Sequence, residues 1–203
     1  MLALREQPRR RLCVATGTIF LLTVLAGHSL AQAPAKSTLP GGDNRPTRQP
    51  SRLGPTDTSF LMRAAEGGLY EVAAGKLAAS RGHLEQVRAF GVMLVADHSA
   101  ISTRLTALAR DHGVTVPGEI PAKQEVILER LLKLSGTEFD RQFIQTVGID
   151  NHQEAIALFQ KAAASVQSEA VRAFAQESLP TLQAHLAAAE QLARMTAKVA
   201  ETP

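Results

Sequence analysis

Three histidines of this sequence fall on apolar stripes where a packed helix would ordinarily carry a hydrophobic residue. The apolar neighbours of the first, His98, recur in alternating steps of three and four residues: Leu84, Val87, Gly91, Leu94, Ile101, Leu105 and Leu108. His152 lies three residues after Ile149 and four before Ile156, and His185 takes a similar place near the C-terminus. Such spacing is typical of a helix face buried against other helices. Because a buried imidazole needs a hydrogen-bond partner or a metal ion, these positions are candidates for chemistry.

A carboxylate takes the corresponding place on the first predicted helix, where Glu71 falls among small residues. With a helical rise of about 1.5 Å per residue, His98 lies about 24 Å along its helix from the turn at Gly82. Counted from a turn near Gln167, His152 and His185 lie at about 22 and 27 Å. The histidines therefore share a layer near mid-bundle. Glu71, at about 16 Å from Gly82, is a turn or more out of register.

Three neutral imidazoles and one carboxylate suit zinc, iron or copper, metals that accept nitrogen ligands. We therefore predict a metal site formed by Glu71, His98, His152 and His185, with Asp97 or Asp140 holding the ligands in place. Di-iron bundles use a Glu-x-x-His motif on two helices. The residues three positions before the histidines are Val95, Ile149 and Leu182, so only a mononuclear site is expected. No catalytic residue is predicted.

The alternative is a purely structural polar layer. In that case each histidine bonds a nearby carboxylate or carbonyl and only fixes the register of the helices. Asp97, Asp140 and Asp150 are the carboxylates available for this. The sequence leaves this alternative open.

The elements that must position these residues are helices throughout. From Asp57 onward no strand-type alternation occurs. Long helices are expected over 57–79, 83–112, 137–165 and 168–198, with Asp57 capping the first and a shorter helical piece over 122–134. Short turns within each pair and one long connection between helices two and three predict an all-α four-helix bundle over 57–198. "VRAF" occurs at 87–90 and 171–174, a hint of a duplicated hairpin.

The N-terminal residues predict export. "RRR" at 9–11 precedes an apolar run and then small residues, the layout of a secretory signal peptide over 1–31 with cleavage near Ala31. Residues 32–56 are rich in proline and glycine and read as a flexible linker, and residues 199–203 as a tail. The only cysteine, Cys13, lies inside the signal, which excludes disulfides and thiolate ligands in the mature protein.

Charge argues against nucleic acid as a partner. The sequence has 22 basic and 19 acidic residues. Four of the basic residues and one of the acidic residues lie in the first 31 positions, so 18 of each remain in the mature chain. A nucleic-acid-binding surface needs clustered positive charge, and the predicted bundle has no excess of it. The apolar run of the signal is too short for a membrane anchor, so no transmembrane span is expected in the mature chain.

Four segments carry a resemblance to a known family. "FLMRAAEGGLYEVAAGKLA", "VMLVADHSAISTRLTALARDHG", "FDRQFIQTVGIDNHQEAIALF" and "LPTLQAHLAAAEQLA" resemble the helices of an exported bacterial family, domain of unknown function 4142, often labelled as an outer-membrane protein. The resemblance covers about residues 57 to 195. It implies a ferritin-like bundle and gives weight to Glu71, Asp97, His98, Asp140, His152 and His185. It supplies no established function.

Two functions follow from these observations. The first is a periplasmic or secreted bundle that binds a metal ion or small ligand through its buried His/Glu layer. The second is a non-enzymatic envelope interaction or stress protein whose polar layer is structural. An enzyme is disfavoured, because no nucleophile–base pair, phosphate loop or cofactor fingerprint occurs. Neither a protein partner nor a homo-oligomer is specified by the sequence.

Overall fold

The structure, a computed structural model, describes residues 52–200. The expected signal peptide and residues 32–51 of the expected linker lie outside the described residues, as do residues 201–203 of the tail. Residues 52–200 contain no strand. The elements are α1 (Pro55–Arg81), α2 (Glu85–Asp111), α3 (Ala122–Leu132), α4 (Gly136–Phe143), η1 (Ile144–Asn151), α5 (His152–Ser165) and α6 (Glu169–Ala200). None of these helices is long and apolar enough to cross a membrane.

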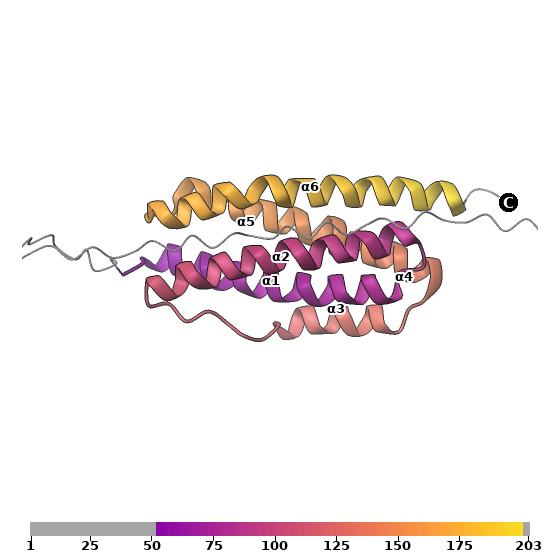
Figure 1. The fold of residues 1–203 in the computed structure, drawn as a ribbon, viewed down its shortest axis with the longest axis horizontal. Coiled ribbons are helices and arrows are strands. Elements are labelled where there is room, and N and C mark those ends of the chain that lie inside the picture. The colour runs from indigo at the N-terminus through magenta and orange to yellow at the C-terminus, as the bar shows by residue number, and fades with distance from the viewer. Residues whose placement is uncertain (1–51, 201–203) are drawn as a thin grey trace, which may run out of the picture. The chain divides into compact units, whose positions relative to one another are not determined.

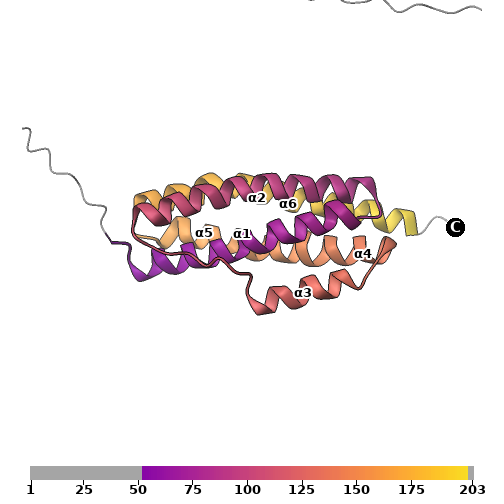
Figure 2. The ribbon, with the colours of Figure 1, turned by 60° about the horizontal axis from the view of Figure 1, so that its bottom comes forward.

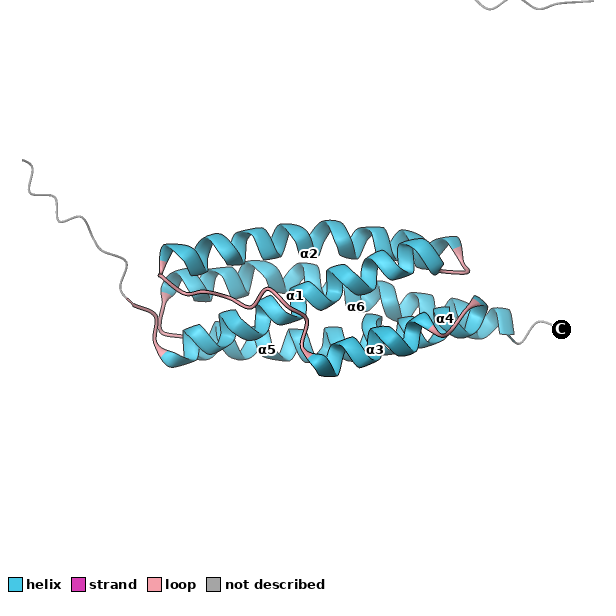
Figure 3. Ribbon diagram, turned by 90° about the horizontal axis from the view of Figure 1, so that it is seen from below, coloured by secondary structure: helices cyan, strands magenta, loops and turns pink. Residues whose placement is uncertain are grey.

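The long helical segments pack side by side into a helical bundle, in agreement with the all-α fold that the sequence predicts (Figure 1). α1 and α2 make one antiparallel hairpin, and the continuous run α4–η1–α5 makes a second with α6 (Figure 1). After α2 the chain returns along the outside of the bundle over α1 and enters α3 (Figure 2). Seen from below, α3 lies against the outer side of the bundle and does not close either end (Figure 3). The long connection therefore lets both hairpins keep short turns.

The third long helix differs from the expected regular helix at its centre. Residues Ile144–Asn151 form a π-helix between α4 and α5. Gly148 lies within it, and a Cβ atom there would stand 2.7 Å from Cβ of Ala189. The π-helical segment thus approaches α6 too closely for any side chain at this position. Single π turns are often found at functional sites, and this segment ends immediately before His152.

Buried aspartates join the two hairpins in a reciprocal way. Asp57 of α1 is fully buried, and its carboxylate accepts hydrogen bonds from the backbone N–H of Ser168 (2.8 Å) and Gln167 (3.4 Å). Asp140 of α4, also fully buried, accepts hydrogen bonds from the backbone N–H of His83 and Leu84, both at 2.8 Å. Each hairpin therefore supplies a carboxylate to the turn of the other.

This arrangement corrects the expectation that Asp57 caps its own helix. α1 begins two residues earlier, at Pro55, and no side chain caps its first turn. The carboxylate instead satisfies amides at the start of α6, which lie 110 and 111 positions away in the sequence. Free N–H groups at a helix start need acceptors, and a carboxylate from another helix serves as well as a local one.

The repeated "VRAF" segments make equivalent contacts in the two hairpins. Arg88 donates to the backbone carbonyls of Gly82 and His83, and Arg172 donates to that of Val166. Both arginines thus bond carbonyls of the turn that precedes their helix. The valines and phenylalanines of the repeat are all buried. The structural equivalence agrees with the duplicated hairpin suggested by the sequence.

Two apolar clusters fill the bundle on either side of a polar layer. The first gathers the start of α1, the end of α2, the end of α5 and the start of α6, with Phe60, Phe159 and Phe174 at its centre. The second includes Phe90 and Phe143, together with Val87, Leu94, Phe139, Ile144 and Leu192. His98, His152 and His185 belong to neither cluster and are themselves buried. The packing therefore isolates a polar layer inside the bundle.

Candidate metal centre

The three predicted histidines meet in the core. His98 comes from α2, His152 is the first residue of α5, and His185 lies on α6. Each is at most 4% exposed. The ring centroids are 5.2 to 5.6 Å apart. One ring nitrogen of each residue lies within 4.8 Å of the others. These side chains are therefore close enough together to bind one metal ion.

The backbone fixes the tautomer of His152. Its Nδ1 lies 2.9 Å from the carbonyl oxygen of Val147, a residue of η1. A carbonyl can only accept, so Nδ1 carries the proton and Nε2 holds a free electron pair. That Nε2 atom points to His185. Burial lowers the pKa of His152 to about 4, although the bond to Val147 opposes this shift. The ring is therefore neutral at physiological pH.

A carboxylate orients His185 in the same manner. Nε2 of His185 lies 2.9 Å from Oδ2 of Asp97 on α2. The carboxylate accepts, so this nitrogen carries a proton and donates. In the neutral ring the remaining nitrogen, Nδ1, then holds an electron pair. Metal-bound histidines commonly donate their second N–H to a carboxylate or a carbonyl, as His185 and His152 do here.

The two free nitrogens face each other. Nε2 of His152 is 3.3 Å from Nδ1 of His185. With both rings neutral, two electron pairs would meet at this distance, which is unfavourable without a proton or a cation between them. Two nitrogens bound to one zinc ion at 2.0–2.1 Å and a tetrahedral angle lie about 3.3–3.4 Å apart. The observed spacing therefore matches that of two ligands of one ion.

His98 is the unsatisfied member of the cluster. Its Nε2 is buried and has no hydrogen-bond partner. Burial, and to a smaller extent the neighbouring His152 and His185, lower the pKa of His98 to about 3. Leaving a buried polar atom without a partner costs about 1–3 kcal/mol. His98 therefore adds a neutral nitrogen ligand that no protein group uses.

Glu71 lies beside the cluster, outside its set of ligand atoms. It is 2% exposed, and its Oε1 is 3.7 Å from Nδ1 of His152. Because Nδ1 is the nitrogen that donates to Val147, Glu71 stands on the side of the ring away from His185. Asn151 donates a hydrogen bond to Oε1, and Oε2 has no partner. Burial raises the pKa of Glu71 to about 8, although the Asn151 bond lowers it.

Only one of the two aspartates expected to hold the ligands in place contacts a histidine of the cluster. Asp97 holds His185, as expected for a residue that orients a ligand. Asp140 instead bonds the turn before α2, where its partners are His83 and Leu84. His98 lies 14 residues beyond Leu84, which corresponds to about 21 Å along the helix. Asp140 therefore stabilises the fold at a distance from the histidines.

Sequence reasoning missed several parts of this site. The Val147 carbonyl and the Asn151 amide are available to His152 and Glu71 through the π-helical segment. The sequence analysis also did not single out Tyr70, which immediately precedes Glu71 in the chain and is fully buried. The weak signals for the π-helix were Gly148 and the pair Asp150–Asn151, all poor helix formers.

Comparison with known proteins agrees with this geometry at the level of the fold. The family described as "Domain of unknown function (DUF4142)" matches residues 43–192. The chain belongs to this DUF4142 family. The expectation from the four helical segments is thus confirmed. We found no match among curated proteins.

A solved structure shares the fold of this DUF4142 chain. It is the crystal structure of a DUF305 fragment from Deinococcus radiodurans, with a TM-score of 0.63 and 16% sequence identity. The match covers 70% of this chain and 99% of that one. At this identity the likeness shows the helical fold alone.

Proposed function

We propose that this protein is an exported metal-binding bundle that holds one zinc, iron or copper ion through His98, His152 and His185. The observation that carries the proposal is the approach of Nε2 of His152 to Nδ1 of His185, 3.3 Å apart in the core, while the other nitrogen of each ring is bonded to an acceptor. All three rings are buried and come from different helices. Asp97 and the Val147 carbonyl serve as the groups that orient two of the ligands.

The chemistry of the donor set favours borderline transition metals. Neutral imidazoles suit zinc, copper, iron and nickel, whereas magnesium and calcium prefer oxygen ligands. Three protein ligands leave a fourth position open to water or another small ligand. Glu71 contacts Nδ1 of His152, the ring nitrogen that does not face His185. We therefore assign the three histidines as the metal ligands and do not include Glu71 among them.

A purely structural polar layer explains the contacts of fewer of the three histidines than a metal ion does. A proton on Nδ1 of His185 would make a hydrogen bond to His152 and leave an imidazolium paired with Asp97. This protonation would satisfy two rings. It would leave Nε2 of His98 buried without a partner, whereas a metal ion can accept a nitrogen from all three.

The proposed location rests on the N-terminal residues. The arginines at 9–11, the apolar run and the small residues that follow support export to the periplasm or beyond. There the bundle would bind its ion without thiol ligands, because the mature chain has no cysteine.

Calorimetric titration of the chelator-treated chain with Zn²⁺ tests this function. The unaltered protein should bind one ion per chain, and His185→Leu should abolish binding while the helical circular dichroism is retained. His83→Gln, at the exposed α1–α2 turn, serves as the matched control and should bind as the unaltered protein does. Equal Zn²⁺ binding by the unaltered and the His185→Leu proteins would contradict the assignment.

A further inference from the structure

Four side chains of the described residues bury a polar atom that has no hydrogen-bond partner. The atoms are the Tyr70 hydroxyl, Oε2 of Glu71, Nε2 of His98 and Oε1 of Gln124. All four residues line the same cavity. Buried polar groups are nearly always bonded, so their concentration at one place needs an explanation. A polar occupant of the cavity would provide it.

The cavity leads from solvent to the histidine cluster. It has a volume of about 430 Å³ and lies between α1, α3, η1 and α5. His98 is part of its wall, whereas His152 and His185 are not. An ion that reaches the three nitrogens through this cavity therefore meets His98 first.

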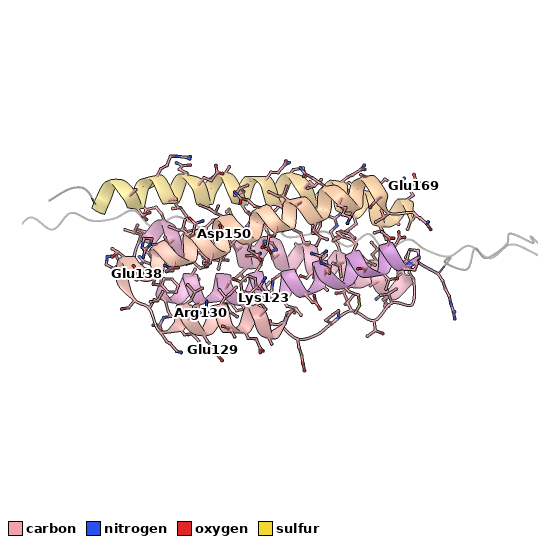
Figure 4. The ribbon with its side chains drawn as sticks, turned by 180° about the vertical axis from the view of Figure 1, so that it is seen from behind. Lys123, Glu129, Arg130, Glu138, Asp150 and Glu169 are labelled. Carbon is pink, nitrogen blue, oxygen red and sulfur yellow. The ribbon has the colours of Figure 1, made fainter. Side chains whose placement is uncertain are left out.

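Charge around the cavity favours a cation. Its wall includes Glu66, Asp150 and Glu154, against only two basic residues, Arg63 and Lys123. Glu71 also lines it, but the pKa of this carboxyl is raised to about 8, so it holds its proton at neutral pH. Figure 4 shows Lys123 on α3 and Asp150 on the π-helical segment.

The environment of Tyr70 points to the same sign of potential. Burial raises the pKa of the Tyr70 hydroxyl, and the charges of Glu71 and Glu154 raise it further. At neutral pH the charge of Glu154 supplies the negative potential, which opposes ionisation of the phenol and attracts cations. Glu71 adds to it only as the pH rises above its raised pKa of about 8. Three of the unpartnered atoms are oxygens, which can replace water around an incoming metal ion.

We propose that this cavity is the route by which the metal ion reaches the three histidines, with oxygen atoms of Tyr70, Glu71 and Gln124 replacing part of its hydration on the way. The inference rests on the proposed function, because it requires a metal site at the inner end of the cavity. It adds a kinetic role for residues that do not belong to the site itself.

The chain carries its own reporter for this step. Tyr70 is the only tyrosine, and there is no tryptophan. Its emission therefore reports on the cavity alone. Rapid mixing of the metal-free protein with Cu²⁺, which quenches nearby tyrosine emission, gives the rate constant of uptake. A separate equilibrium titration gives the number of ions bound.

Changing the charge of the cavity wall should change the uptake rate in opposite directions. Glu66→Gln combined with Glu154→Gln should slow uptake by about threefold to tenfold at low ionic strength, because it weakens the attraction of the cavity for cations. Lys123→Gln should speed uptake by about twofold or more for the same reason. Both effects should shrink at high salt, and the number of ions bound should not change.

Control variants remove a single charge of each sign elsewhere. Glu169→Gln, at the start of α6, and Arg130→Gln, on α3, change residues outside the cavity lining. Both residues are labelled in Figure 4. They should leave the uptake rate unchanged. Normal copper binding with the same rate in the cavity variants, or an equal change in the controls, would overturn the route alone. Failure of the unaltered protein to bind copper would overturn the proposed function and the route together.

Discussion

Nε2 of His152 faces Nδ1 of His185 at 3.3 Å, although the other nitrogen of each ring already donates its proton elsewhere. The Val147 carbonyl and the Asp97 carboxylate fix this orientation from the main chain of η1 and from α2. If both rings are neutral, neither of the two facing nitrogens carries a hydrogen, so no hydrogen bond can form between them. A cation placed there would also gain the unpartnered nitrogen of His98.

Removing the charge of Asp97 should weaken metal binding without abolishing it. Asp97→Asn still offers an acceptor to Nε2 of His185 but lowers the basicity of the ring. We expect the Zn²⁺ affinity to fall by about 10–100-fold, the usual effect of losing a residue that orients a ligand. Competition with a chromophoric chelator measures the change. Asp111→Asn on the same helix is the control, and an equal loss there would argue against a specific role for Asp97.

Glu71 should make the metal-free protein less stable as the pH rises. Its pKa is raised from 4.5 to about 8 by burial, so the folded state holds a proton that the unfolded state releases. This contribution to stability is complete below pH 4.5 and is lost as the pH rises to about 8. Urea denaturation across this range should show the decline in the unaltered protein and a flatter profile in Glu71→Gln. Parallel profiles would show that Glu71 is not responsible.

Asp140 should matter for folding and not for the metal. In Asp140→Ala the backbone N–H groups of His83 and Leu84 lose their acceptor, which should lower the free energy of unfolding by about 1–3 kcal/mol. Zn²⁺ affinity should be unchanged. The exposed Asp150 provides the control, since Asp150→Ala should change stability by no more than about 0.5 kcal/mol. Loss of metal binding with normal stability in Asp140→Ala would contradict this assignment.

Adding a methyl group at Gly91, where α2 contacts α1, should destabilise the protein. A Cβ atom on Gly91 would stand 2.6 Å from both the backbone nitrogen of Ala79 and the carbonyl oxygen of Gly75. We therefore expect Gly91→Ala to cost about 1–3 kcal/mol of stability. Gly67 has nothing within 4 Å of that position, so Gly67→Ala should instead stabilise by about 0.5–1 kcal/mol. Thermal denaturation compares the two, and similar effects at both positions would refute the packing argument.

Helical periodicity was sufficient to predict the fold and the meeting of the histidines. Each histidine interrupts a regular apolar stripe, and the helical rise places all three at a common height. The same estimate put Glu71 about a turn out of register. In the structure its carboxylate does not join the three nitrogens, although it lies beside His152.

Contacts that depend on topology could not be predicted in the same way. The acceptor roles of Asp57 and Asp140 join residues more than 50 positions apart, so they follow only once the arrangement of the two hairpins is known. The π-helical segment packs Gly148 closely against Ala189 and leaves little trace in local sequence. Its effect on the site is large, because it supplies the carbonyl that sets the tautomer of His152.

The most direct measurement is the metal content of the chain from residue 32 to 203, purified without chelator or affinity tag and analysed by elemental mass spectrometry. We expect close to one zinc, iron or copper ion per chain, lost in both His98→Leu and His185→Leu. Only trace metal in the unaltered protein, with no uptake on later incubation with Zn²⁺, Fe²⁺ or Cu²⁺, would contradict it. The three histidines would then be a structural layer of the bundle.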